Sequence, residues 1–357
     1  MKKALSLILA LSLLFLSATA LSSCNTDGKV KDPTPRTKEI SYVYFNTFSI
    51  ITSYAGVSEK TLDSYAQVAD EVLGSYHKLF DIYYEHSGVN NIKTINDNAG
   101  VSAVEVDEKL IDFLEYCKQL YTLTNGKTNI MLGSVLRIWH DVRTEASDNG
   151  GSVDKSRLPA REALDKANEH TSIESLVIDR EAGTVYISDP EASIDVGAVG
   201  KGYAAKMLAR ELKEMGADSL AINAGGNIVT IGVKPSGEKW TTGITNPNPL
   251  SSQSFVARIR IGEGALVTSG DYERFFISDG VRYHHIIDPD TLIPADYFTS
   301  VSVITPDSAL ADALSTALFC MSYEGGKALA ESIGNVEVIW VDKEYNVKHT
   351  DGVVFVN

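Results

Sequence analysis

Apolar residues recur at three- and four-residue spacings in some stretches of the chain and alternate with polar residues in others. The first pattern predicts amphipathic helices and the second predicts half-buried strands. The predicted helices span residues 62–76, 110–120, 161–169, 203–215, 308–323 and 324–333. The predicted strands span residues 175–179, 184–188, 218–223, 253–261, 282–287, 299–304 and 336–341. Runs of strands with helices between them favour an α+β fold, a single large domain of mixed or antiparallel sheet with flanking helices.

Residues that typically start or end a helix lie next to two of the predicted helices. Asp107 lies just before the predicted helix 110–120 and is a suitable N-cap, because its carboxylate can accept a backbone N–H of the first turn. Gly216 directly follows the predicted helix 203–215 and marks its end. A glycine-bearing turn joins the first two predicted strands, which therefore predict a hairpin.

The N-terminus has the pattern of an export signal. A basic start precedes an apolar run over residues 4–16, which is too short to span a membrane and typical of a signal peptide. The sequence LSSC follows and ends at Cys24, as in the cleavage box of bacterial lipoproteins; an ordinary secretory signal with an incidental cysteine is the alternative. We predict a lipoprotein signal peptide over residues 1–23, lipidation of Cys24, and a lipid-anchored protein on the extracytoplasmic side of the cell membrane.

The segment that follows is polar, contains proline and has no periodicity. It predicts a flexible tether over residues 24–40, followed by one catalytic domain over residues 41–357. Beyond Cys24 the chain has only Cys117 and Cys320, each within an apolar stretch. Two buried thiols are the favoured state, with a disulfide as the alternative in an oxidising compartment.

Composition and charge exclude several classes of protein and of binding partner. The chain of 357 residues is 44% hydrophobic and 22% charged, which excludes wholesale disorder and a multi-span membrane protein. Its formal net charge of −15 repels nucleic acid and anionic lipid headgroups, so we expect no nucleic-acid partner and membrane contact through the lipid anchor alone. An anionic small molecule would need a metal ion or directed backbone amides to hold it.

The first segment that carries chemistry spans residues 194–203. A predicted strand ends at Asp195, a glycine-rich turn follows, and a helix begins near Lys201. Glycines let a ligand approach the backbone, and a helix start offers free N–H groups to phosphate oxygens. The spacing differs from that of a nucleotide-triphosphate loop. The segment predicts an anion near the helix start; a tight turn with a solvated lysine is the alternative.

The second segment is ADALST, residues 311–316. On a helix, Asp312, Ser315 and Thr316 share one face. Carboxylate and hydroxyl oxygens grouped in this way suit a hard cation such as Mg²⁺. Taken alone, the segment fits a capping Asp and two small residues at a packed interface better than it fits a metal site.

The third segment is YHHIIDP, residues 283–289. Neighbouring side chains of a strand face opposite sides, so only one of His284 and His285 should face a given site. A histidine beside a phosphoester is a natural general base. A structural, hydrogen-bonded histidine before a turn fits this segment equally well.

Six motifs in one order resemble the ApbE family of FAD:protein FMN transferases, which has a T-fold-like α+β domain. They are IDVGAVGKGY at 194–203, NAGGN at 223–227, Trp240 with Gly243-Ile244, TSGDY at 268–272, HIIDP at 285–289 and DALST at 312–316. The resemblance covers almost the whole chain after the signal peptide. Thr47-Phe48-Ser49 stands where the family usually has Thr-Met-Gly, and Thr128-Asn129 where it usually has an aromatic or apolar residue followed by Asp.

The resemblance implies a metal-dependent enzyme that cleaves FAD, attaches FMN through a phosphoester to a Thr or Ser hydroxyl of an envelope flavoprotein, and releases AMP. It implies Mg²⁺, with Mn²⁺ as an alternative, held by Asp312, Thr316 and the carbonyl of Ala198. Asp312 and His285 would be catalytic, with His285 as the base for the acceptor hydroxyl. The residues implied to contact FAD are Phe48, Tyr83, Lys127, Thr128, Asn129, Asp195, Lys201 and Ile286.

Two other functions remain open at this point. A metal-dependent FAD pyrophosphatase would use the same residues, with water in place of the protein hydroxyl and FMN and AMP as products. A flavin-binding lipoprotein without turnover is the second alternative. Pure binding needs no general base, so Asp312, Thr316 and His285 argue against it.

Overall fold

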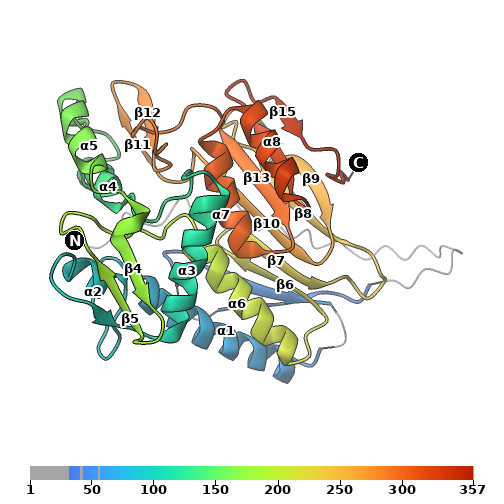
Figure 1. Ribbon diagram of the computed structural model, residues 1–357. Coiled ribbons are helices and arrows are strands. Elements are labelled where there is room, and N and C mark those ends of the chain that lie inside the picture. Colours follow the sequence, from blue (N-terminus) through green and yellow to red (C-terminus); the bar gives the residue numbers. More distant parts are fainter. Residues whose placement is uncertain (1–31, 41–42, 55–56, 357) are drawn as a thin grey trace, which may run out of the picture. The chain divides into compact units, whose positions relative to one another are not determined.

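The central feature of the structure is an eight-stranded antiparallel sheet (Figure 1), within a computed structural model that describes residues 32–40, 43–54 and 57–356. Its strand order is β1-β2-β6-β7-β10-β13-β14-β15, and every neighbouring pair is antiparallel. The strands are β1 (Arg36–Glu39), β2 (Ser49–Ser53), β6 (Ser219–Ala224), β7 (Asn227–Gly232), β10 (Gly264–Gly270), β13 (Ser300–Thr305), β14 (Glu337–Val341) and β15 (Val347–His349). The predicted α+β class and antiparallel sheet are confirmed.

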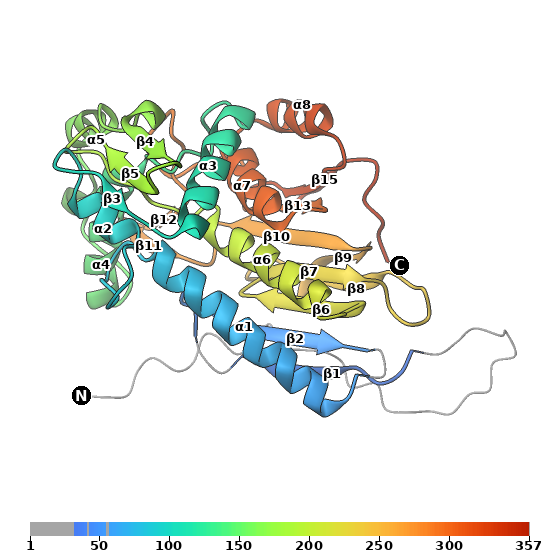
Figure 2. The same cartoon turned by 60° about the horizontal axis from the view of Figure 1, so that its bottom comes forward.

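Helices cover one face of this sheet, where α1, α6 and α7 run beside one another (Figure 2). The helices are α1 (Glu59–Phe80), α3 (Glu108–Leu123), α6 (Gly200–Glu214), α7 (Ser308–Phe319) and α8 (Tyr323–Ile333). Helix α7 is apolar on nearly all sides, since Leu314, Leu318 and Phe319 are all completely buried. A helix of this kind lies inside the core, so polar residues on α7 are held in a protected environment.

The opposite face of the sheet is covered by a hairpin. Strands β8 (Trp240–Thr245) and β9 (Phe255–Ile261) pair antiparallel, and their apolar side chains pack on strands of the main sheet. Trp240, Ile244 and Ile259 form a small core there with Leu266 and Ile339. The main sheet is therefore buried on both faces.

A second group of elements lies beside the helical layer (Figure 1). It contains α2 (Ile92–Asp97), β3 (Val104–Glu105), α4 (Gly133–Asp148), α5 (Arg161–Asn168), β4 (Leu176–Asp179), β5 (Thr184–Ile187), β11 (Phe275–Ser278) and β12 (Val281–His284). Helix α4 packs on α5 and β11 through a core that includes Val135, Trp139, Leu164 and Phe276. This packing brings α4 close to the loop that joins β10 to β11.

Several predicted elements are confirmed, with changes at their ends. Asp107 caps α3 by accepting the backbone N–H of Lys109 at 2.8 Å. The predicted helix 308–323 ends at Phe319, because Ser322 caps a new helix, α8. The strand predicted to end at Asp195 was wrong: this stretch has only an isolated bridge between Ser193 and Leu132.

The prediction of a flexible tether over residues 24–40 was wrong near its C-terminal end. Residues 36–39 form β1, which pairs with β2 from Arg36 opposite Ser53 to Glu39 opposite Ile50. All four residues of β1 are exposed, so the strand has no alternating apolar pattern. Backbone hydrogen bonds to β2 hold it at the edge of the sheet. The predicted signal peptide, Cys24 and residues 25–31 lie outside the described residues.

Two further findings concern the cysteines and the membrane. Cys117 and Cys320 are both buried and both free, as the sequence favoured. Within residues 32–40, 43–54 and 57–356, no helix combines the length and the apolar character that crossing a membrane requires.

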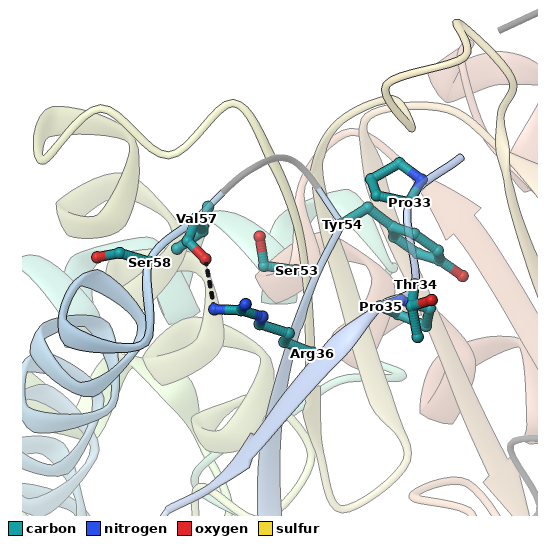
Figure 3. Close-up of a pocket in the computed structure, with 8 residues that line it drawn as sticks. All are labelled: Pro33, Thr34, Pro35, Arg36, Ser53, Tyr54, Val57 and Ser58. Carbon is teal, nitrogen blue, oxygen red and sulfur yellow. Dashed lines mark hydrogen bonds between the residues drawn. The ribbon is translucent and has the colours of Figure 1, made fainter. Parts of the chain in front are cut away.

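A hollow of about 410 Å³ lies where the described chain begins, between β1 and the start of α1 (Figure 3). Arg36 crosses it and donates a hydrogen bond from Nη1 to the carbonyl of Val57 at 3.1 Å. The hollow shares no lining residue with the cavity described next.

Candidate active site

A second cavity, of about 240 Å³, collects residues from segments far apart in the sequence. Its walls come from the turn before β2, the end of α1, the loop after α3, helix α4, the start of α6, the loop before β11, the segment after β12, and α7. The predicted site residues that line it are Tyr83, Lys127, Thr128, Asn129, Asp195, Ala198, Lys201, His285, Ile286 and Thr316. The three separate segments singled out in the sequence thus meet at one place.

The glycine-rich turn packs tightly against α7. Asp195 closes the turn by accepting the backbone N–H of Gly197 at 2.8 Å. The backbone N–H of Gly202 donates to Oδ2 of Asp312 at 2.7 Å, and a Cβ on Gly202 would lie only 2.5 Å from the Cβ of Asp312. Gly202 is therefore glycine because the backbone of α6 lies directly against the Ser308 carbonyl and the Asp312 side chain of α7.

We expect Gly202→Ala to destabilise the fold by about 1–3 kcal/mol, since the new methyl group overlaps Asp312 and the helices must separate. Thermal unfolding of the purified protein measures this effect. Gly262→Ala is the matched control, because a Cβ there would meet nothing closer than 4.0 Å. Equal melting temperatures for the two variants would contradict the proposed close packing.

The residues predicted to hold a metal occupy different depths. Thr316 lines the cavity, whereas Asp312 is buried beneath it with 6% of its surface exposed. Burial raises the pKa of Asp312, and Lys201 and the Gly202 N–H oppose that rise. Ser315 is completely buried and shares a hydrogen bond of 2.8 Å with the hydroxyl of Ser269 on β10. It therefore anchors α7 to the sheet.

The carboxylate of Asp312, the hydroxyl of Thr316 and the backbone carbonyl of Ala198 are suitable ligands for a hard cation. A carboxylate, a hydroxyl and a backbone carbonyl are the oxygen donors that Mg²⁺ prefers, and a buried carboxylate requires a compensating positive charge. Next to Asp312, the side chain of Asn227 is buried, and its hydrogen bond to the carboxyl group opposes the rise in the pKa of Asp312. The described part of the chain has no cluster of three or more His, Cys, Asp or Glu side chains suited to a metal, so a cation here would rely on this mixed set.

The two histidines point to different surroundings. His284 ends β12, is 5% exposed, and packs on Phe319 with its Nε2 hydrogen-bonded to the carbonyl of Ala295 at 2.8 Å. His285 lines the cavity, and its Nδ1 lies 3.2 Å from the carbonyl oxygen of Arg274. A carbonyl oxygen can only accept, so Nδ1 carries the proton and Nε2 is the free basic nitrogen.

The electrostatic environment keeps His285 neutral. Burial and the nearby charges of Arg274 and Arg143 lower the pKa of His285 well below the ordinary value of 6.5. A neutral imidazole with its tautomer fixed by a carbonyl can accept a proton at neutral pH.

The predicted FAD contacts in the loop after α3 are polar groups that already have partners. Lys127 pairs with Asp288 at 2.7 Å and Asp290 at 2.8 Å. Thr128 donates to the carbonyl of Ala313, and Asn129 donates to a backbone carbonyl and accepts the N–H of Met131. These side chains shape the cavity wall, and Thr128 anchors it to α7.

Phe48 was predicted to contact the ligand, but it does not line the cavity. It is 61% exposed, whereas Phe45 and Asn46 line the cavity instead. A bridge between Tyr44 and Thr47 closes a turn with Phe45 and Asn46 at its tip, both with positive φ. The tip of this turn, and not Phe48, therefore reaches the cavity.

Helix α4 supplies site residues that the sequence analysis missed. His140 and Arg143 line the cavity, and Nδ1 of His140 lies 3.2 Å from the hydroxyl of Tyr83. Its Nε2 lies 4.0 Å from Oδ2 of Asp195. The buried residues of α4 include Val135, Trp139, Val142 and Ala146, at spacings of four, three and four, so a helical signal was present in the sequence. Arg274, in the loop before β11, was also missed.

Comparison with proteins of known structure places this fold in a defined class. The ApbE protein from Thermotoga maritima superposes with a TM-score of 0.73 at 27% identity, covering 88% of this chain and 97% of that one. The flavin transferase ApbE from Vibrio cholerae gives a TM-score of 0.72 at 25% identity, covering 89% and 97%. The fold is that of ApbE proteins.

Sequence comparison identifies the family. The model of the ApbE family matches residues 45–340, and the chain belongs to this family. An FAD:protein FMN transferase of Treponema pallidum (strain Nichols) is 31% identical over 279 residues, 74% of each chain. Another from Klebsiella pneumoniae (strain 342) is 29% identical over 269 residues, 75% of this chain and 79% of that one. The resemblance predicted from the six motifs is confirmed.

Proposed function

We propose that this protein is an FAD:protein FMN transferase, which moves FMN from FAD to a Thr or Ser hydroxyl of an acceptor flavoprotein and releases AMP. The observation that carries the proposal is the meeting of His285, Thr316 and the start of α6 at one cavity. A base, oxygen donors and backbone amides are what phosphoryl transfer to a hydroxyl requires. The names of the relatives agree with this reaction.

A divalent cation is part of the proposal. Asp312, Thr316 and the carbonyl of Ala198 would hold Mg²⁺, or Mn²⁺ in its place. When bound, the cation would supply positive charge to the phosphate oxygens of FAD. Lys201 lines the same cavity, and its Nζ lies 3.4 Å from the carbonyl of Gly225, so its charge remains available to an anionic ligand.

His285 would take the proton of the acceptor hydroxyl on Nε2. The carbonyl of Arg274 holds its ring in one tautomer, and the lowered pKa keeps that nitrogen unprotonated at neutral pH. Ile286 and Phe45 are apolar walls of the same cavity, and they would help to exclude water from the reacting groups. Excluding water favours transfer to the protein hydroxyl over hydrolysis of FAD.

The export signal supports a location for this activity. We propose that the mature protein is anchored by lipid on Cys24 at the extracytoplasmic face of the cell membrane and acts on envelope flavoproteins. The basic start, the apolar run and the LSSC sequence support this assignment. Labelling with a radioactive or clickable fatty acid tests it, and a Cys24→Ala variant that still took up label would contradict it.

The transfer reaction is tested by incubating the protein with FAD, Mg²⁺ and a candidate acceptor. We expect the acceptor to gain the mass of an FMN phosphoester on one Thr or Ser, and to stay fluorescent in a denaturing gel. AMP release should be faster with the acceptor than without it, because a docked hydroxyl is positioned for attack. An acceptor whose modified residue is replaced by Val is the control. Free FMN with unlabelled acceptors would instead support a pyrophosphatase.

A further inference from the structure

Two arginine side chains line the active-site cavity without a carboxylate partner. Arg143 comes from α4 and is half-buried, and Arg274 comes from the loop before β11 and is exposed. Among the residues that the structure describes, neither guanidinium forms an ion pair or a side-chain hydrogen bond. Several arginines on the surface do have such a partner: Arg157 pairs with Glu145 at 2.7 Å, and Arg180 pairs with Asp112 at 2.6 Å.

The two guanidinium groups are close enough to act on each other. Burial and the charge of Arg274 lower the pKa of Arg143. Both charges also act on His285, and Arg274 acts on the buried carboxylate of Asp312. The packing of α4 on β11 explains this proximity, because Arg274 directly precedes β11 (Figure 1). Asp195, which lines the same cavity, opposes part of the lowering of the pKa of Arg143. A further anion between the two guanidinium groups would offset the rest of their repulsion.

The proposed reaction produces a new negative charge on one phosphate group. The acceptor oxygen bonds to the phosphorus of the FMN half, the bond from that phosphorus to the bridging oxygen breaks, and the bridging oxygen leaves with AMP. The hydroxyl proton passes to Nε2 of His285. The FMN phosphorus has one negative charge before and after transfer, as a phosphodiester, whereas the AMP phosphate changes from one negative charge to two. The new charge therefore develops on the leaving AMP.

We propose that Arg143 and Arg274 together bind the phosphate of the leaving AMP. This inference rests on the proposed function. Two guanidinium groups match a phosphate dianion in charge, and each can donate two parallel N–H bonds to its oxygens. Because the dianion forms only as the bond breaks, the pair stabilises the transition state more than bound FAD and acts mainly on kcat.

The test compares the binding of AMP with that of adenosine, by titration calorimetry in Mg²⁺ without FAD or acceptor. We expect Arg143→Gln and Arg274→Gln each to weaken AMP binding by about 10- to 100-fold, the effect of losing a charged hydrogen bond, while adenosine binding is unchanged. Unchanged adenosine binding also shows that each variant is folded. Arg137→Gln is the matched control, because Arg137 lies on α4 but is exposed and does not line the cavity.

Three outcomes would overturn the proposal. One is AMP affinity that stays at the wild-type value in both variants. Another is an equal loss for AMP and adenosine, which would indicate damage to the cavity. The third is a raised KM for the acceptor with AMP affinity intact, which would mean that the arginines bind an acidic side chain of the acceptor. Because binding is measured without turnover, arginine-dependent binding of AMP by a protein that transfers no FMN would support this inference and contradict only the proposed function.

Discussion

Asp312→Ala should reduce AMP release from FAD to less than about one-hundredth of the wild-type rate, since the proposed cation site loses its only carboxylate. The substitution should also cost stability. The backbone N–H of Gly202 donates to Asp312 in the interior, and removing the acceptor leaves that donor unpaired, at about 1–3 kcal/mol. Asp312 therefore has a structural contact as well as a proposed catalytic one, and the sequence left both roles open.

Asp312→Asn separates these two effects. The amide oxygen can still accept the N–H of Gly202, so thermal stability should stay closer to the wild-type value, while the charge needed by the cation is lost. AMP release is measured for both variants over a range of Mg²⁺ concentrations. A near-wild-type rate for either variant in excess Mg²⁺ would contradict the metal assignment.

His285→Ala should slow FMN transfer by about 10²- to 10⁴-fold, the usual contribution of a positioned general base, with little change in FAD affinity. In the wild-type protein the rate should stay high at neutral pH and fall only well below pH 6.5, because the pKa of His285 is lowered and protonation removes the base. Single-turnover rates of acceptor labelling across pH measure both effects.

His284→Ala is the control for this prediction. His284 is buried against Phe319 and hydrogen-bonded to the carbonyl of Ala295, so its loss should lower the melting temperature. The transfer rate per folded molecule should change far less than in His285→Ala. Equal losses of rate in the two variants, or a greater loss in His284→Ala, would show that the wrong histidine has been assigned as the base.

The sequence predicted the fold class because its long amphipathic helices and several strands, among them β6, β13 and β14, carry clear periodicity. The buried strands β2, β7 and β10 of the same sheet were not predicted. Helix α1 extends from Glu59 to Phe80 around the predicted stretch 62–76. Helix α4 was missed although its buried residues have helical spacing, and no cap hydrogen bond marks its start. Strand β1 was missed because all its residues are exposed, and exposure removes the apolar alternation on which strand prediction depends.

The site residues were predicted from sequence motifs, and a motif does not show how the chain folds around it. Lys201, His285 and Thr316 line one cavity, but nothing in the sequence showed that Phe45 would take the position expected of Phe48. That exchange follows from a turn whose geometry depends on positive φ at two residues. Arg143 and Arg274 are 131 positions apart in the sequence, so only the packing of α4 on β11 relates them.

The edge strand β1 has a consequence for proteins crowded on one surface. An unpaired strand edge can join the sheet of a neighbouring molecule, and copies held by the proposed lipid anchor would meet often in the plane of a membrane. Charged side chains and prolines discourage such joining. Strand β1 reads RTKE, with two prolines just before it, and Lys38 pairs with Asp63 of α1 at 2.6 Å. The polar side chains that prevented the prediction of this strand from the sequence would thus also keep neighbouring copies apart.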